Sequence, residues 1–186
     1  MNKSETTKFL SDLLIRDWLP EIGKYYVRQV IIDPWTDHGR KVDFMQFIPD
    51  NQISVSGIEK GNFVCYEVKS CKEDIYSGEG LTFVGDMNYI VTTMECYKSI
   101  LDDYRDGTLG RFIKDKDPEA SNHFGILVPV PDERRLPEEF YDPTPLDSNM
   151  DRWKLREVMP CHPAYRKRSM TELLFYMLRS CKLSRN

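Results

Sequence analysis

The chain has 186 residues, of which 40% are hydrophobic and 30% are charged, and its formal net charge is −4. This length and composition are typical of one folded domain with its own core, and they exclude a low-complexity or fibrous chain. No apolar stretch reaches the roughly 20 residues that a membrane-spanning helix needs, and the N-terminal segment is acidic where a secretory signal is apolar. We therefore expect a cytoplasmic protein with no membrane partner.

The first half of the chain predicts one helix followed by a series of strands. Ser4 is a candidate N-cap for a helix whose apolar residues recur at helical spacing until Pro20 ends the pattern. Three later stretches are rich in β-branched and aromatic residues and predict strands, namely residues 25–33, 41–49 and 63–70. Residues 53–57 predict a short extended piece before the third strand.

The next part of the chain extends this pattern. Residues 72–86 contain three glycines and predict a loop with at most a short helix. After it we expect a strand over 88–94, a helix over 95–106, and a strand over 123–131 that its prolines end. Together these elements predict an α/β core over residues 1–131.

The last third of the chain is expected to pack on the same domain. Residues 132–165 are rich in proline and acidic residues, which predicts an irregular connection. Residues 166–186 combine a basic segment with a C-terminal helix, for which Ser169 and Glu172 form a capping-box pattern. The helix carries a stripe of apolar residues, Leu173, Leu174, Phe175, Met177 and Leu178. Such a stripe is typical of a core, but it could also dock a second copy in a homodimer.

The charge is distributed unevenly along the chain, and the cysteines show no pairing pattern. Residues 151–186 hold nine Lys and Arg against three Asp and Glu, a balance of +6, so residues 1–150 carry −10. The basic cluster of Arg166, Lys167 and Arg168 is a candidate phosphate-binding surface, although a solvated surface is an equally good interpretation. The five cysteines are widely spaced and form no C-x-x-C pair, which predicts reduced thiols.

The stretch YEVKS places two charges inside an otherwise apolar strand. Side chains on a strand alternate between its faces, so Glu67 and Lys69 project together from one face. On the second predicted strand, alternation groups Val42 with Phe44 and leaves Asp43 on the other face with Met45.

If the two strands are neighbours, Asp43, Glu67 and Lys69 converge on one patch. Two close carboxylates repel each other, and a divalent cation such as Mg²⁺ or Mn²⁺ stabilises them through hard oxygen ligands. An ammonium beside such an ion can orient a water or hold a phosphate oxygen. These parts suit metal-assisted hydrolysis of a phosphodiester.

A purely structural interpretation competes with this hypothesis. Glu and Lys two residues apart are often an exposed pair on the wet face of an antiparallel sheet, worth under about 1 kcal/mol. Here the flanking residues from Phe63 to Val68 are mostly apolar and predict burial on both faces. A buried charge is costly without a partner, which favours the metal site.

The order of elements, with V-D-F on the second strand and Y-E-V-K-S on the third, resembles the PD-(D/E)XK nuclease superfamily. Residues 67–97 look most like MmcB-type DNA-repair-associated proteins and related proteins of phages and mobile elements. The resemblance covers about residues 5–131. It implies a restriction-endonuclease-like αβββαβ core with a mixed central sheet, followed here by a C-terminal extension that ends in a helix.

The resemblance also implies a mechanism and its residues. Mg²⁺-dependent hydrolysis of DNA would use Asp43, Glu67 and the backbone carbonyl of Val68 as metal ligands, and Lys69 would position the attacking water. Glu21 is a possible counterpart of a further acidic ligand on the first helix. The alternative is a catalytically inactive nuclease-like module that binds nucleic acid or protein. The intact trio favours the enzyme, whereas the acidic net charge and the glycine-containing loop favour the inactive module.

Overall fold

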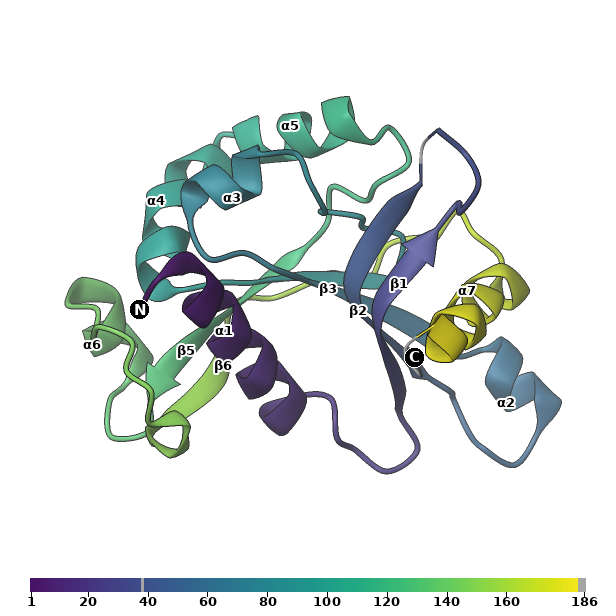
Figure 1. Ribbon diagram of the computed structural model, residues 1–186, viewed down its shortest axis with the longest axis horizontal. Coiled ribbons are helices and arrows are strands. Elements are labelled where there is room, and N and C mark those ends of the chain that lie inside the picture. The colour runs from purple at the N-terminus through teal and green to yellow at the C-terminus, as the bar shows by residue number, and fades with distance from the viewer. Residues whose placement is uncertain (38, 184–186) are drawn as a thin grey trace.

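The computed structural model describes residues 1–37 and 39–183 and shows a mixed six-stranded sheet with helices on both faces (Figure 1). The strands lie in chain order across the sheet: β1 (Tyr25–Ile32), β2 (Arg40–Ile48), β3 (Asn62–Val68), β4 (Met87–Val91), β5 (Gly125–Pro131) and β6 (Trp153–Met159). The three central strands β3, β4 and β5 are parallel, whereas the other neighbours pair antiparallel. The predicted α/β class with a mixed sheet is confirmed.

Helices connect and cover these strands. They are α1 (Lys3–Asp17), α2 (Val55–Glu59), α3 (Lys72–Tyr76), α4 (Met94–Arg105), α5 (Thr108–Lys116), α6 (Leu136–Tyr141), a 3₁₀ turn (Met150–Arg152) and α7 (Met170–Leu183). Within the described residues, none of these helices is both long and apolar enough to cross a bilayer. The order α1, β1, β2, β3, α3, β4, interrupted only by the short α2, is the predicted helix, strand meander, helix and strand.

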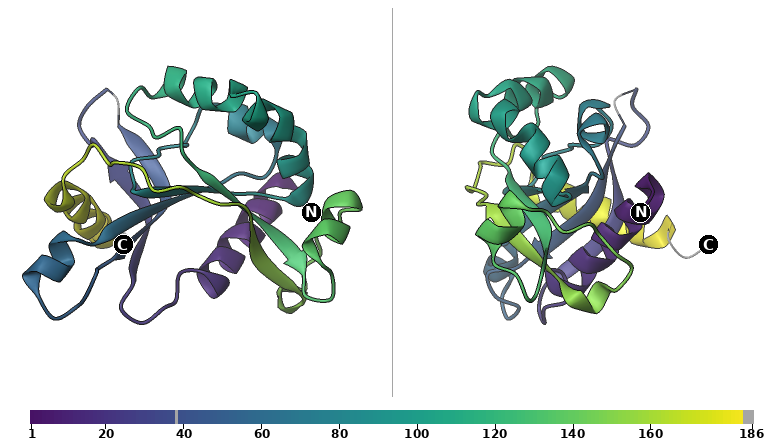
Figure 2. Two further views of the ribbon diagram at one scale, coloured as in Figure 1. Left: turned by 180° about the vertical axis from the view of Figure 1, so that it is seen from behind. Right: turned by 90° about the vertical axis from the view of Figure 1, so that its left-hand side faces the viewer.

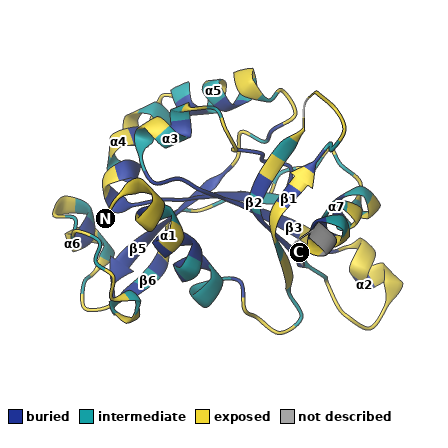
Figure 3. Ribbon diagram, in the orientation of Figure 1, coloured by how far each residue is buried: buried dark blue, intermediate teal, exposed yellow. Residues whose placement is uncertain are grey.

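The sheet separates two apolar layers. Helix α1 packs its Leu10, Leu13 and Leu14 on one face, against side chains such as Tyr66 and Trp153. On the other face α4 and α5 cover β4 and β5, and α7 covers β1 to β3. Strands β3, β4 and β5 are the most buried part of the molecule, whereas α2 is mostly exposed (Figure 3). The rear view shows the C-terminal segment crossing from β6 to α7 along this second face (Figure 2).

Two helix starts differ from the sequence prediction. Asn2, not Ser4, is the N-cap of α1, and it forms a capping box with Glu5, so the helix begins two residues earlier than expected. Residues 53–57 were expected to be extended, but Ser54 accepts a hydrogen bond from the Gly57 amide and caps α2. The short run of residues 53–57 therefore begins a helix instead of an extended piece, because the Ser54 side chain caps its first turn.

The prediction of an irregular connection over 132–165 is wrong. This interval contains α6 and the edge strand β6, and β6 contributes the buried Trp153 and Leu155 to the core. Helix α5 was also not expected. Pro129 and Pro131 lie within β5, where β5 has passed the end of β4 and pairs with β6 alone. A proline lacks the amide that a central position needs, so these two are tolerated only on such a one-sided stretch.

The apolar stripe of α7 is divided between core and solvent. Leu173 and Met177 are buried against β1 to β3, while Phe175 and Leu178 are exposed. Ser169 accepts from the Glu172 amide, as the capping-box pattern predicts. The Glu172 carboxylate bonds to Arg168 and Tyr176. A homodimer through this helix stays a prediction.

Candidate active site

The site lies where β2 and β3 separate. Their pairing ends at Phe44 opposite Tyr66, so Asp43 and Glu67 are the first residues beyond the ladder. The Asp43 side chain takes the place of the missing backbone partner, because its Oδ2 accepts from the Val68 amide at 3.0 Å. Its Oδ1 accepts from the side chain of Gln29 at 3.2 Å. We call the point where β2 and β3 separate the fork. There, the Asp43 carboxylate of β2 lies against the end of β3.

Strand alternation is broken at this point. Val42 packs in the same apolar cluster as Met45, and Phe44 packs on the opposite face. The expected grouping of Val42 with Phe44 is therefore wrong. Gln29, the residue of β1 whose side chain donates to Asp43, has a φ of +56°, a value that non-glycine residues rarely adopt. Beside this irregularity, the Asp43 side chain lies against the end of β3.

Glu67 is a completely buried carboxylate. Its Oε1 accepts from the Thr82 amide at 3.0 Å, whereas Oε2 has no hydrogen-bond partner among the described residues. Burial and the neighbouring carboxylate of Asp43 raise the pKa of Glu67 well above its ordinary value, against the opposing effects of Lys69 and the Thr82 amide. The residues that flank it on β3, from Phe63 to Val68, are all buried as predicted.

Lys69 is held beside Glu67 by the loop that follows β3. Its ammonium donates to the backbone carbonyl of Glu79, and only 5% of the residue is exposed. Gly80 has a φ of +72°, and a Cβ atom there would lie 2.9 Å from Glu67 Oε2 and 3.0 Å from Lys69 Nζ. The loop backbone thus closes over both charged groups at a position where only glycine fits.

A cavity of about 590 Å³ opens beside these groups, and we call it the site cavity. Asp43, Val68 and Lys69 line it from the sheet. Lys3 and Thr7 line it from α1, and Lys116 lines it from the end of α5. The structure therefore brings Asp43 and Lys69 to one cavity between the N-terminal half of α1 and the C-terminal end of α5, whereas Glu67 is buried beside Lys69 and does not line it.

Sequence reasoning missed several residues of this cavity. Asp74 accepts from the Ser70 amide at 3.1 Å and lies 3.0 Å from Lys3. Partial burial opposes ionisation, but these contacts lower the pKa of Asp74. A glycine-rich loop directly after E-x-K was the available signal for Gly80. No signal linked Lys3 to the site, because it precedes Asp43 by 40 residues.

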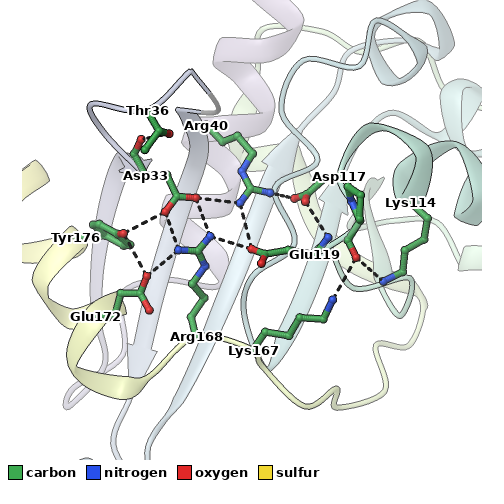
Figure 4. Close-up of polar contacts among 11 residues, drawn as sticks. Asp33, Thr36, Arg40, Lys114, Asp117, Glu119, Lys167, Arg168, Glu172 and Tyr176 are labelled. Carbon is green, nitrogen blue, oxygen red and sulfur yellow. Dashed lines mark hydrogen bonds and ion pairs between the residues drawn. The ribbon is translucent and has the colours of Figure 1, made fainter.

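The basic segment does not reach the site. The Arg168 guanidinium bonds to Asp33 at 2.6 Å and to Glu119 and Glu172 at 2.9 and 2.7 Å (Figure 4). Arg166 bonds to Asp86 at 2.6 Å. These two charges are compensated inside the fold, which speaks against the predicted role of this cluster in binding phosphates.

Lys167, the third residue of the basic cluster, also has a partner inside the fold. Lys167 donates to the Pro118 carbonyl at 3.1 Å. Arg40, which lines the site cavity, forms ion pairs with Asp117 and, at 3.1 Å, with Asp33 (Figure 4). Asp33 therefore binds both Arg168 and Arg40. Through this shared carboxylate, the basic segment contacts the residues that hold Arg40 at the wall of the site cavity.

Glu21 is not brought to the site either. It lies beyond the C-terminal end of α1 and pairs with Lys24, whereas the N-terminal residues of α1 line the cavity. At 1.5 Å per residue, the length of α1 alone separates the two ends by about 20 Å. Glu21 is thus too far away to share an ion with Asp43.

The acidic groups present fit a small oxygen-bound cation. Glu67 Oε2 is buried without a partner, and the Asp43 carboxylate lies beside it. Within the described residues, no group of three or more His, Cys, Asp or Glu side chains is arranged to hold a metal. Two carboxylates suit Mg²⁺, which commonly keeps several waters and uses one or two protein carboxylates.

The chain was compared with protein-family models, with curated proteins and with solved structures, and none of the three comparisons found a match.

Proposed function

We propose that the protein is a metal-dependent deoxyribonuclease of the PD-(D/E)XK type that acts in DNA repair or in DNA processing by a phage or mobile element. Asp43 and Glu67, with the Val68 carbonyl as a further ligand, would hold Mg²⁺ or Mn²⁺. The observation that carries the proposal is the buried Glu67 carboxylate, whose Oε2 has no partner among the described residues and lies beside Asp43 and Lys69.

The chain fixes each of these groups before any ligand arrives. The Thr82 amide holds Glu67 Oε1 and leaves Oε2 without a hydrogen-bond partner among the described residues. The amide of Val68 and the side chain of Gln29 hold the two oxygens of Asp43. Such fixed partners set the orientation of a metal ligand and limit its reorganisation on binding.

Lys69 supplies the positive charge of the site. Its ammonium is anchored on the Glu79 carbonyl, beside Glu67 and at the wall of the site cavity. In the proposed reaction it orients the attacking water and faces the negative charge that develops on the phosphate. A bound divalent ion would supply Lewis-acid stabilisation of that charge and lower the pKa of a bound water.

Metal binding tests the first half of the proposal. Calorimetric titration of the protein with Mn²⁺ is expected to show binding that the Glu67→Gln variant loses. An absence of binding, or equal binding by parent and variant, would contradict the metal site.

Cleavage tests the second half. A plasmid-nicking assay with Mg²⁺ or Mn²⁺ is expected to show activity in the parent protein and a loss of at least about a hundredfold in Lys69→Ala, in line with the effect of removing one charge-stabilising donor. Equal nicking by both proteins would point to a contaminant. Metal binding without any nicking would support the inactive nuclease-like module instead.

A further inference from the structure

A second cavity adjoins the site cavity along the first half of α1. Its volume is about 560 Å³. Both cavities are lined by Lys3, Thr7, Asp43 and Val68, so they form one continuous depression that passes over Asp43. We call the second cavity the α1 groove.

The α1 groove is lined by cations and hydroxyl groups. The cations are Lys3, Lys8 and Arg28, and the hydroxyls belong to Ser4, Thr7 and Ser11. Among the described residues that line it, Asp43 of the metal site provides the one carboxylate. Lysine, arginine, serine and threonine are the side chains that most often contact the phosphates and sugars of nucleic acids.

Arg28 is the cation best placed to bind a phosphate. Its guanidinium lies over the ring of Phe44, 5.2 Å from the ring centroid, and both residues line the groove. It forms no ion pair with any other residue that the structure describes, so its donors stay available. Planar guanidinium groups bind phosphates through two parallel hydrogen bonds.

The two lysines are held only by surface ion pairs. Lys3 lies 3.0 Å from Asp74, and Lys8 lies 3.2 Å from Asp12. Both lysine side chains are largely exposed, at 65% and 80%. Exposed pairs contribute at most about 1 kcal/mol, so a phosphate can compete for either lysine.

The polar groups of α1 are spaced along one stripe of the helix. Ser4, Thr7, Lys8 and Ser11 follow one another at intervals of three, one and three residues, which places them on one face. From Ser4 to Ser11 the helix rises about 10 Å. A DNA strand advances about 3.4 Å per nucleotide, so this stripe spans roughly three nucleotides.

We propose that the α1 groove binds the sugar–phosphate backbone of the DNA strand on one side of the phosphate that is cleaved. This inference rests on the proposed function, which makes DNA the substrate. The groove offers cations and hydroxyls to the backbone, so binding is independent of base sequence and weakens with salt. It also replaces Arg166, Lys167 and Arg168 as the nucleic-acid-binding surface.

The test compares binding of a short fluorescein-labelled single-stranded oligonucleotide by fluorescence anisotropy in EDTA, where metal-dependent cleavage does not occur. The double variant Lys8→Gln/Arg28→Gln is expected to raise Kd about tenfold or more. Each phosphate contact that is lost lowers the dependence of log Kd on log salt by about 0.7, so the slope is expected to fall by about 1.4.

Two further variants sharpen the comparison. Lys60→Gln is the matched control, because Lys60 is an exposed cation at the end of α2, at the other end of the molecule from the start of α1 (Figures 1 and 2). It is expected to bind as the parent does. Ser4→Glu places a negative charge in the groove at an exposed position of the first turn of α1, where an acidic residue also suits the helix dipole. It is expected to weaken binding without loss of helix.

The outcomes separate the groove from the proposed reaction. If Lys8→Gln/Arg28→Gln and Ser4→Glu bind with the Kd and salt slope of the parent, the groove proposal is overturned, whether or not the protein cuts DNA. If both variants lose binding while the parent never nicks plasmid DNA, the groove stands and the nuclease proposal fails. Equal weakening by Lys60→Gln would also overturn the groove, because it would show a diffuse charge effect.

Discussion

The carboxylate of Asp43 accepts a hydrogen bond from the backbone amide of Val68 at 3.0 Å, across the point where β2 and β3 cease to pair. Asp43 is therefore both a proposed metal ligand and a structural partner of β3. Removing the side chain leaves a partly buried amide without an acceptor, which costs about 1–3 kcal/mol.

This double role predicts different effects for two substitutions. Asp43→Ala is expected to lose nicking and to be less stable than the parent by about 1–3 kcal/mol in urea unfolding. Asp43→Asn keeps an oxygen that can accept from Val68, so it is expected to lose nicking with a smaller loss of stability. Equal destabilisation by both variants would contradict the role of the hydrogen bond.

Glu67→Gln is expected to stabilise the metal-free protein at neutral pH. Burial and Asp43 raise the pKa of Glu67 above its ordinary value of 4.5, so the folded protein holds a proton that the unfolded chain releases. The parent therefore loses stability as pH rises from about 4.5 to the raised pKa, and the neutral glutamine does not. Thermal unfolding at a series of pH values measures the difference.

The same experiment includes a metal arm. Each 1 kcal/mol corresponds to about 2–4 °C in Tm for a chain of this size. The difference in Tm between Glu67→Gln and the parent is expected to shrink as pH falls toward about 4.5. Added Mg²⁺ is expected to raise the Tm of the parent but not that of Glu67→Gln. An advantage that does not depend on pH would show that the titration of Glu67 is not its cause.

Gly80→Ala is expected to damage the site as well as the fold. The positive φ of Gly80 costs an alanine about 1–2 kcal/mol, and its Cβ would press on Glu67 Oε2 and Lys69 Nζ. Gly78 is a matched control, because it has a similar φ of +77° and a Cβ there would meet only the flexible end of Lys116. Both variants are expected to lose similar stability by urea unfolding. Only Gly80→Ala is expected to weaken Mn²⁺ binding in calorimetry. Equal Mn²⁺ binding by the two variants would contradict a close contact between the Gly80 backbone and the side chains of Glu67 and Lys69.

Arg168→Ala is expected to destabilise the protein by about 2–3 kcal/mol, because it leaves three carboxylates close together without their shared cation. Lys167→Ala is the control, and its loss is expected to stay within about 0.5 kcal/mol, since the lysine donates only to an exposed carbonyl. Urea unfolding of the two variants provides the comparison.

The effect of Arg168 is also expected to depend on pH. Burial opposes ionisation of Asp33, but hydrogen bonds from Arg168 and Arg40 lower the pKa of Asp33 below its ordinary 3.8. The stability that this contributes is complete above about pH 4 and is lost as pH falls through the lowered pKa. The gap in Tm between the parent and Arg168→Ala should therefore narrow below about pH 4, and a constant gap would contradict the ion pair as its source.

Most of the fold can be predicted from periodicity and turn residues. Helices α1, α4 and α7 have apolar residues at helical spacing, and the buried strands are runs of β-branched and aromatic residues. β6 was missed because its short run, WKLREVM, lies between proline-rich stretches and has charged residues at alternate positions. The convergence of Asp43, Glu67 and Lys69 could be anticipated from residue type and strand order. The break in strand alternation beside Asp43 could not, because it coincides with the unusual backbone of Gln29, the residue of β1 that donates to Asp43.

Charge was the least informative part of the sequence. It showed that the C-terminal segment is basic, but the acidic partners of Arg168 lie at Asp33, Glu119 and Glu172, and two of the three are distant along the chain. The cations of the α1 groove went unnoticed for the opposite reason. Lys3 and Lys8 are far from Arg28 in the sequence, and only the fold, which places α1 on one side of the groove and β1 and β2 on the other, gathers them.

The ion pairs of Arg168 have a consequence for synthesis. Asp33 and Arg168 are separated by 135 positions in the chain. A ribosome releases the whole sheet, both carboxylates of the fork and the groove before it releases Arg168, which follows β6. The wall that carries Arg40 therefore lacks one of its neutralising charges until Arg168 has been synthesised, after every strand of the sheet.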